Sequence, residues 1–282
     1  MLPFEGYATY VALQLQRVQH FLAPRSGALH YDPMSRRLTI IGSYVSPYVR
    51  KVLACMNLKS IPFEVDPITP FFGNDEFRRL SPLCRIPILI DGDFAASDSS
   101  VICAYLDEAY PGHALLPDDP KDRAHARWLE EYADTRLGEL LIWSLFYQKI
   151  VHPLVWGEPG DQARIDKALD EDIPAALDYL ERQTPAEGFL FGDIGLADIS
   201  VATFFRNGSY AGFEIDAGRW PRTAGWVSRT LGHACFADLF RFEDVQRNAD
   251  IKGRRQALLD AGARLTQQTL GEREPRRGMM RL

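Results

Sequence analysis

Ser46 stands directly before Pro47, where an apolar run with helical spacing begins. A serine followed by a proline at the first helical position is a strong helix start, because the serine hydroxyl can cap the first turn. A helix N-terminus also attracts anions. Since capping uses only a lone pair of the hydroxyl oxygen, the O–H remains available to donate. We therefore predict that Ser46 caps a helix and donates to an anion, with Ser43 as the competing candidate.

Pro87 precedes two apolar residues that are typical of a buried strand, Ile88 and Leu89. A proline at the start of a strand has few comfortable geometries, and a cis peptide bond is one of them. If Ile86 is turned outward, its N–H and C=O groups form a free strand edge with which an extended peptide can pair. Ile86 and Pro87 are therefore candidates for binding a peptide backbone.

Asp98 and Ser99 precede a predicted helix at residues 100–110. Capping of that helix is sufficient to explain such a pair. A helix N-terminus also suits a carboxylate, and the Asp98 side chain suits an ammonium group. Because an α-amino acid end carries both groups, Asp98 and Ser99 are candidates for binding the end of a small peptide.

The composition excludes several classes of function. The net charge of −6 argues against nucleic acid as a partner, and no apolar run is long enough to cross a membrane. The first residues do not have the pattern of a secretory signal. The four cysteines show no metal-ligand spacing, and Cys55 and Cys103 fall in apolar helical runs. We therefore expect a cytoplasmic protein without a metal, with its cysteines reduced.

From residue 38 the sequence alternates between strand and helix patterns. Strands are expected at 38–42, 61–68, 86–90 and 94–96, helices at 47–58 and 100–110, and a short helix or turn at 74–80. Pro62 and Pro67 place the second strand at an edge of the sheet. This order predicts a small α/β domain with a mixed sheet.

The pattern changes after Pro111, because only helical periodicities follow. We expect an N-terminal extension at 1–37, an α/β domain at 38–112, a linker at 113–120, an all-helical domain at 121–250 and a C-terminal extension at 251–282. The N-terminal extension has helical spacing between Tyr7 and Leu22. It is either a docking helix or a leader upstream of a true start at Met34, and both interpretations remain open.

Five segments, met in order along the chain, resemble motifs of the cytosolic glutathione transferases. They are S-P-Y-V-R-K-V at 46–52, S-P-L-C-R-I-P-I-L at 81–89, D-S-S-V-I at 98–102, G-D-I-G-L-A-D at 192–198 and W-P-R-T-A-G-W at 220–226. The resemblance covers residues 38 to about 246. It is to the serine-type classes of the family, and the chain looks bacterial-like and resembles the tau-type and zeta-type members. It implies a thioredoxin-like N-terminal domain with a mixed four-stranded sheet, followed by an all-α domain.

The resemblance also implies roles in binding glutathione, the co-substrate of this family. Ser46 would contact the glutathione sulfur, and the backbone of Ile86, ahead of a cis Pro87, would pair with the cysteinyl unit. Asp98 and Ser99 would bind the γ-glutamyl end. A further cation, Arg85, is either near the glycyl carboxylate or directed to solvent.

A second substrate would lie between the two domains. The aromatic candidates to line its pocket are Tyr44, Tyr48, Phe146, Tyr147 and Trp156. The chain departs from the family at Cys84, where a glycine is common, and at Gly195, where a capping Ser or Thr is usual. Because glycine has no side chain to cap with, Asp198 would have to cap that helix unaided.

The resemblance implies a homodimeric detoxification enzyme that transfers the glutathione thiolate to an electrophilic, mostly apolar small molecule. Reductive dehalogenation, isomerisation or peroxide reduction by the same thiolate is an alternative. A thiol-disulfide exchanger is disfavoured, since that class carries cysteine where Ser46 stands. A non-catalytic binding protein on the same fold, as in the stringent starvation proteins, is the alternative outside enzymes.

Overall fold

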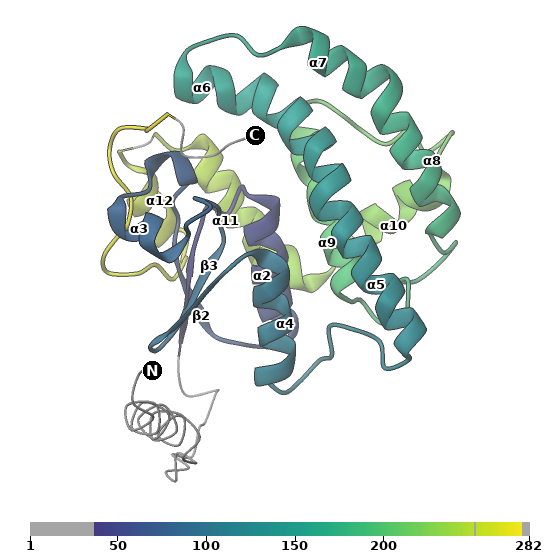
Figure 1. The fold of residues 1–282 in the computed structure, drawn as a ribbon, viewed down its shortest axis with the longest axis horizontal. Helices are drawn as coiled ribbons and strands as arrows, with labels where there is room; N and C mark the ends of the chain where they lie inside the picture. Colours follow the sequence, from purple (N-terminus) through teal and green to yellow (C-terminus); the bar gives the residue numbers. More distant parts are fainter. Residues whose placement is uncertain (1–36, 251, 278–282) are drawn as a thin grey trace, which may run out of the picture. The chain divides into compact units, whose positions relative to one another are not determined.

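The computed structural model describes residues 37–250 and 252–277. The predicted helix in the N-terminal extension, and the choice between a docking helix and a leader, lie outside the described residues. Four strands form one sheet in the order β2-β1-β3-β4 (Figure 1). The strands are β1 (Leu38–Ile41), β2 (Phe63–Asp66), β3 (Ile88–Asp91) and β4 (Phe94–Ser97).

The sheet is mixed, as the sequence predicted. β1 pairs parallel with β2 and antiparallel with β3, and β3 pairs antiparallel with β4. Within the four strands β2 is an edge, which agrees with the two prolines that flank it. Alternation along the strands directs Ile40 and Leu89 into one apolar cluster and Ile41 and Ile88 into another on the opposite face.

Helices cover both faces of this sheet. α2 (Pro47–Leu58) and α4 (Ser99–Ala109) pack against each other and bury their apolar sides with Ile40 and Leu89. A short 3₁₀ helix, η1 (Pro70–Phe72), leads into α3 (Asp75–Leu80), whose Phe77 joins the cluster of Ile41. The thiols of Cys55 and Cys103 are fully buried between α2 and α4, as expected of core residues.

The regular elements of the described residues from Pro120 to Asp260 are helices, which confirms the predicted fold class. Its elements are α5 (Pro120–Tyr132), η2 (Ala133–Val151), α6 (His152–Trp156), α7 (Gln162–Lys167), η3 (Ala168–Asp172), α8 (Ile173–Gln183), α9 (Leu196–Tyr210), α10 (Pro221–Leu231), η4 (Ala234–Phe236), α11 (Ala237–Asn248) and α12 (Arg254–Asp260). α5 runs into η2, which has π-helical hydrogen bonding. α9 packs against α5, η2 and α10, and also against α2 of the sheet part.

Asp198 caps α9 without help from a side chain at position 195. Its Oδ2 accepts the N–H of Gly195 at 2.9 Å, while Oδ1 accepts the indole N–H of Trp226 at 2.7 Å and the N–H of Leu190 at 3.0 Å. A Cβ atom at Gly195 would lie 3.0 Å from the carbonyl oxygen of Leu115. The close approach of the linker therefore explains why glycine suits this position.

Among the described residues, no helix combines the length and the apolar character needed to cross a bilayer.

The described chain continues beyond α12. Residues 264–277 return to the sheet part, where Leu265 forms a parallel bridge with Val65 and Gly271 an antiparallel bridge with Gly73 (Figure 1). The sequence had defined this region only as an extension beyond the family motifs.

Candidate functional site

Ser46 lies half-buried at the N-terminus of α2. Its Oγ accepts the N–H of Val49 at 3.4 Å, and its own N–H donates to the carbonyl of Ser43 at 3.0 Å. The competing candidate, Ser43, is only 2% exposed, and its Oγ accepts the N–H of Val45. A hydroxyl that must donate to a ligand needs access to it, and Ser46 meets this requirement better.

The peptide bond between Ile86 and Pro87 is cis. The paired part of β3 begins at Ile88, opposite Ile41, so Ile86 lies outside the strand ladder. Ile86 is half-buried and Pro87 is buried. This arrangement leaves the backbone of Ile86 at the end of the sheet, where an extended ligand can pair with it.

The loop that leads to Ile86 is held by Ser81. The Ser81 hydroxyl donates to the carbonyl of Arg85 at 2.9 Å and accepts the Arg85 N–H at 3.0 Å. The Arg85 side chain is exposed. Cys84 has a φ of +53°, a region that favours glycine, which explains physically why glycine is common at this position in the family.

Asp98 and Ser99 form the start of α4. Asp98 is exposed, and its Oδ1 accepts the N–H groups of Ser100 and Val101 at 3.0 and 3.2 Å. Ser99 is buried. Asp98 has a φ of +86°, which is costly for a residue with a Cβ atom. Backbone strain of this kind concentrates at functional sites.

Two of the five aromatic candidates lie together. The indole N–H of Trp156 donates to the Tyr147 hydroxyl at 3.2 Å, and both rings contact Phe71 of η1, with centroids 5.7 Å away for Trp156 and 6.2 Å for Tyr147. Sequence reasoning had not included Phe71, because no local pattern connects η1 with η2 and α6.

The other three aromatic candidates each contact different residues. Tyr44 is 2% exposed, and its ring packs on Phe242 in the core beside the sheet. The Tyr48 hydroxyl donates to the carbonyl of Asp134 at 3.0 Å. Phe146 is buried with its ring 6.3 Å from that of Tyr210.

Sequence reasoning also missed a buried ionic cluster centred on Lys51 of α2. The Lys51 side chain is fully buried, and its Nζ lies 2.6 Å from Asp134 Oδ2, 3.1 Å from Glu130 Oε1 and 3.2 Å from Ser100 Oγ. Burial would lower the pKa of Lys51, but the carboxylates of Asp134 and Glu130 raise it, so the ammonium stays charged. This cluster connects α2 and the first turn of α4 to α5 and η2.

Arg50, the neighbour of Lys51, connects α2 to α9 and α11. Its guanidinium donates to the Thr203 carbonyl at 2.7 Å and to Asn207 Oδ1 at 2.9 Å, and it pairs with the buried Glu243 carboxylate. The sequence showed one sign of these buried contacts, the adjacent cations Arg50 and Lys51 within an otherwise apolar helix. Their partners lie far away in the chain, so the sequence did not identify them.

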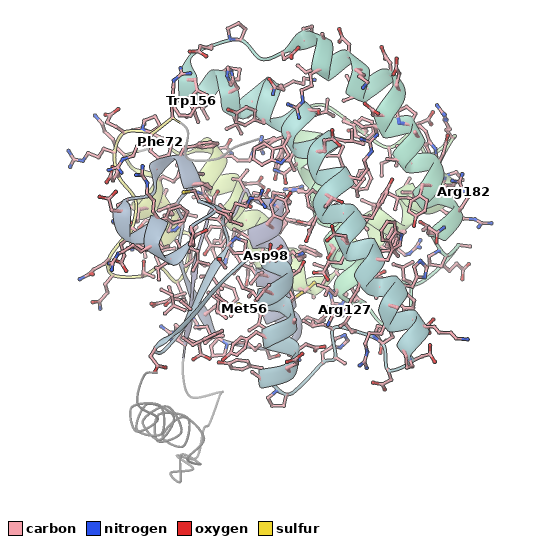
Figure 2. The ribbon with its side chains drawn as sticks, viewed as in Figure 1. Met56, Phe72, Asp98, Arg127, Trp156 and Arg182 are labelled. Atoms are coloured by element: carbon pink, nitrogen blue, oxygen red, sulfur yellow. The ribbon has the colours of Figure 1, made fainter. Side chains whose placement is uncertain are left out.

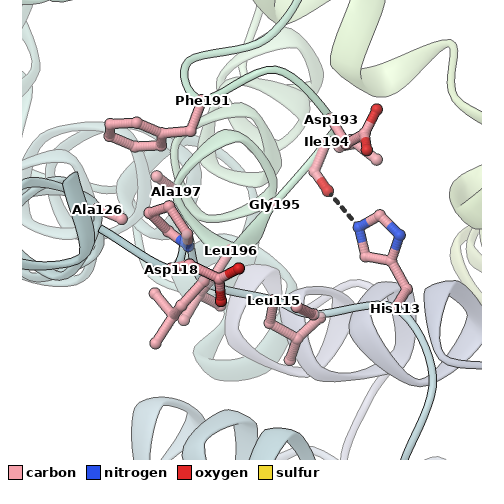
Figure 3. Close-up of a pocket in the computed structure, with 13 residues that line it drawn as sticks. His113, Leu115, Asp118, Ala126, Phe191, Asp193, Ile194, Gly195, Leu196 and Ala197 are labelled. Carbon is pink, nitrogen blue, oxygen red and sulfur yellow. Dashed lines mark hydrogen bonds between the residues drawn. The ribbon is translucent and has the colours of Figure 1, made fainter. Parts of the chain in front are cut away.

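A cavity of about 310 Å³ lies elsewhere, between the linker and the start of α9 (Figure 3). There the ring of His113 approaches the carbonyl of Ile194, with 2.8 Å between Nε2 and the oxygen. None of the residues predicted to bind glutathione lines this cavity.

Among the described residues, no group of three or more His, Cys, Asp or Glu side chains is placed to hold a metal ion.

Comparisons with known proteins show what this chain resembles. The family model of the glutathione S-transferase N-terminal domain matches residues 40–114. A probable glutathione S-transferase of Oryza sativa subsp. japonica, GSTU6, is 28% identical over 213 residues, covering 69% of this chain and 84% of the relative. Glutathione S-transferase U7 of Arabidopsis thaliana is 25% identical over 207 residues, covering 71% and 85%.

Solved structures share the fold. Glutathione transferase F7 from Populus trichocarpa has a TM-score of 0.62 at 23% identity, covering 72% of this chain and 98% of that chain. The sequence relatives and the mixed sheet followed by helices agree: residues 40–114 match the glutathione S-transferase N-terminal domain, and the chain is similar over 69–71% of its length to glutathione S-transferases.

Proposed function

We propose that this protein transfers the thiolate of glutathione to an electrophilic, mostly apolar small molecule, with Ser46 as the residue that stabilises the sulfur anion. The observation that carries the proposal is the half-buried Ser46, whose hydroxyl caps the N-terminus of α2. Arg50 and Lys51 of the same helix are buried and hold α2 in place. The similarity to glutathione S-transferases indicates the substrate.

Attack on an electrophile at neutral pH requires the bound glutathione thiol to have a lower pKa than a free thiol. A free thiol has a pKa of about 8.5, and lowering it by ~2 units corresponds to roughly 2.7 kcal/mol of selective stabilisation of the thiolate. Deletion of one oxyanion donor costs ~3–4 kcal/mol in other enzymes, and a helix N-terminus contributes up to ~2 kcal/mol. One hydroxyl at a helix start is therefore sufficient in magnitude. Ser46 acts as a donor to sulfur and not as a base.

Three further parts of the site hold the rest of the tripeptide. The backbone of Ile86, ahead of the cis Pro87, pairs with the cysteinyl unit as in strand addition. Asp98 binds the ammonium group and the α4 N-terminus at Ser99 binds the carboxylate of the γ-glutamyl end. Arg85, an exposed cation two residues before the proline, approaches the glycyl carboxylate.

We also propose that the protein acts as a cytoplasmic homodimer. Three large apolar side chains of the sheet part are exposed: Leu83 before β3, Phe94 on β4 and Val101 on α4, with 69%, 44% and 54% of their surfaces accessible. Trp128 on α5 is 51% exposed. In this family the α/β domain of one subunit usually packs against the helical domain of the other, and these side chains are of the kind that such an interface buries.

One experiment tests the enzymatic proposal directly. The full chain is passed over immobilised glutathione and assayed with glutathione and 1-chloro-2,4-dinitrobenzene. Retention and conjugation are expected, and in Ser46→Ala conjugation is expected to fall far more than retention. A protein with neither retention nor conjugation would instead be a binding protein on the transferase fold, and the proposal would be rejected.

A further inference from the structure

Residues 264–277 run from the sheet to α6, and we call them the C-terminal strap. The strap begins by extending the open edge of the sheet. The Val65 N–H donates to the carbonyl of Arg264 at 2.9 Å, and the Thr266 N–H donates to the carbonyl of Val65 at 3.2 Å. Figure 1 shows this yellow segment beside α3 and α12. The family motifs end near residue 246, so the strap is an addition to them.

A buried carboxylate anchors the strap. Asp66 is 2% exposed; its Oδ1 accepts the Thr269 hydroxyl at 2.8 Å, and its Oδ2 accepts the Leu270 N–H at 2.7 Å. Arg255 NH1 lies 3.5 Å from Oδ1. A buried carboxylate is costly to leave unpaired, so these contacts fix the middle of the strap to the end of β2.

The strap next runs along η1 and holds it through the backbone. The Asn74 N–H donates to the Leu270 carbonyl at 2.9 Å. Further on, the Glu272 N–H donates to the Phe72 carbonyl at 2.6 Å and the Arg276 N–H to the Phe71 carbonyl at 2.8 Å. The position of Phe71 is therefore set by a segment about 200 residues later in the sequence.

The strap ends on Trp156, one of the five aromatic residues expected to line the second-substrate pocket. The Arg277 guanidinium lies over the Trp156 ring, 4.8 Å from its centroid, and pairs with Glu158. Trp156 in turn contacts Phe71 and hydrogen-bonds to Tyr147. Figure 2 shows Trp156 and Phe72 at the same end of the described structure. Phe71, Tyr147 and Trp156 thus form one aromatic wall, and the strap fixes it from two sides.

We infer that the C-terminal strap determines specificity for the electrophile: by holding Phe71 against Tyr147 and Trp156, it closes one end of the second-substrate site and disfavours long apolar electrophiles. This inference rests on the proposed function. A short electrophile reaches the thiolate without touching the wall. A long one must displace Phe71 or Trp156, and this displacement breaks ring contacts and the stacking of Arg277.

A series of n-alkyl isothiocyanates from ethyl to octyl tests the inference, because only the length of the apolar tail changes. In each reaction the glutathione thiolate adds to the central carbon and the nitrogen takes up one proton, so there is no leaving group. The full chain is compared with the double variant Arg276→Ala/Arg277→Ala. Arg273→Ala is the matched control, because Arg273 is an exposed arginine of the strap with no hydrogen bond or ion pair among the described residues.

The ratio of kcat/KM for octyl to kcat/KM for ethyl isothiocyanate is expected to rise about five-fold in the double variant, as the loss of ~1 kcal/mol of stacking predicts. The ratio of the Arg273→Ala control is expected to equal that of the unchanged chain. An unchanged ratio in the double variant, or an equal change for every tail length, would overturn the inference. Trp156→Ala provides a second variant and is expected to shift the ratio in the same direction.

Calorimetry provides a readout that does not need turnover. The affinity for S-octylglutathione relative to S-ethylglutathione is expected to rise in the double variant. If the unchanged chain binds neither compound and conjugates no isothiocyanate, the proposed function fails. If it binds and conjugates but both ratios stay the same in the variants, only the role of the strap fails. Circular dichroism of each variant establishes that it is folded.

Discussion

The Lys51 ammonium lies 2.6 Å from Asp134 Oδ2, with the lysine side chain completely buried. This pair joins α2, whose N-terminus carries Ser46, to η2 of the helical part. The same Asp134 oxygen accepts the hydroxyl of Ser100 in the first turn of α4 at 2.9 Å. One ionic cluster therefore holds together the two helix starts that are proposed to bind glutathione.

Lys51→Met is expected to destabilise the fold, because it leaves the carboxylates of Asp134 and Glu130 close together without their cation. Removing one partner of a buried ion pair costs ~3–5 kcal/mol. The free energy of unfolding in urea measures the effect. Lys167→Met is the control, since the Lys167 side chain is 66% exposed. A loss of stability no greater than that of the control would contradict the role given to the cluster.

Ser46→Ala is expected to lower kcat by about 10²–10³-fold, in line with the loss of one donor to a reacting anion. Glutathione binding is expected to weaken far less, because the remainder of the tripeptide keeps its contacts. Steady-state kinetics and calorimetry measure the two effects. Ser43→Ala removes the buried neighbouring hydroxyl and is expected to leave kcat nearer that of the unchanged chain. Equal losses in kcat and binding for Ser46→Ala would count against the role.

Asp98→Asn tests the charge of Asp98 separately from its capping role, since asparagine caps a helix as well as aspartate does. The melting temperature is expected to change little, while the Kd for glutathione rises about ten-fold through the loss of a charged hydrogen bond. Asp119→Asn is a matched control: Asp119 caps α5 through two N–H groups at 2.8 and 3.1 Å. Identical glutathione affinities in the two variants would refute the proposal.

Glu181 is expected to contribute a pH-dependent part of the stability. Its carboxylate accepts the N–H groups of Arg222 and Thr223, both at 2.9 Å, at the start of α10. Partial burial raises the pKa of Glu181, but these hydrogen bonds outweigh it and hold the pKa below its ordinary value. The unfolded state then binds more protons, so the contribution is present above the unfolded pKa and is lost as the pH falls through the folded pKa.

At pH 7 the free energy of unfolding of Glu181→Gln is therefore expected to be up to about 1 kcal/mol lower than that of the unchanged chain. The difference is expected to shrink as the pH approaches 3. Chemical denaturation at a series of pH values measures it. Glu187→Gln is the control, because Glu187 is exposed and makes no hydrogen bond or ion pair among the described residues. A deficit that stays constant with pH would show that the carboxylate charge has no role.

Leu83→Glu is expected to dissociate the proposed homodimer, because it replaces one of the exposed apolar side chains proposed for the interface by a charged one. Light scattering after size exclusion measures the mass, which is expected to fall by half. Leu154→Glu is the control: Leu154 on α6 is 71% exposed and is not among the side chains proposed for the interface. A monomer for the unchanged chain would sink the proposal.

Local signals in the sequence predicted most elements near the site. The serine and proline at 46 and 47 marked the start of α2, and the apolar spacing predicted its end at Leu58, as the structure has it. The prolines around β2 predicted an edge strand, and the absence of a side chain at Gly195 predicted that Asp198 caps α9 unaided. Capping, proline geometry and periodicity depend on neighbouring residues only, so a sequence displays them directly.

Tertiary structure decided the contacts between segments that lie far apart in the chain. Lys51 meets Asp134 across 83 residues, and Asp66 meets Thr269 across 203. No periodicity connects such positions, because their proximity results from how the sheet, η1 and the helices pack. The same packing buries Tyr44, joins Phe71 to Trp156, and brings the C-terminal strap back to the first strands of the chain. The sequence by itself determined where helices and strands begin, whereas the packing decided which side chains surround the site.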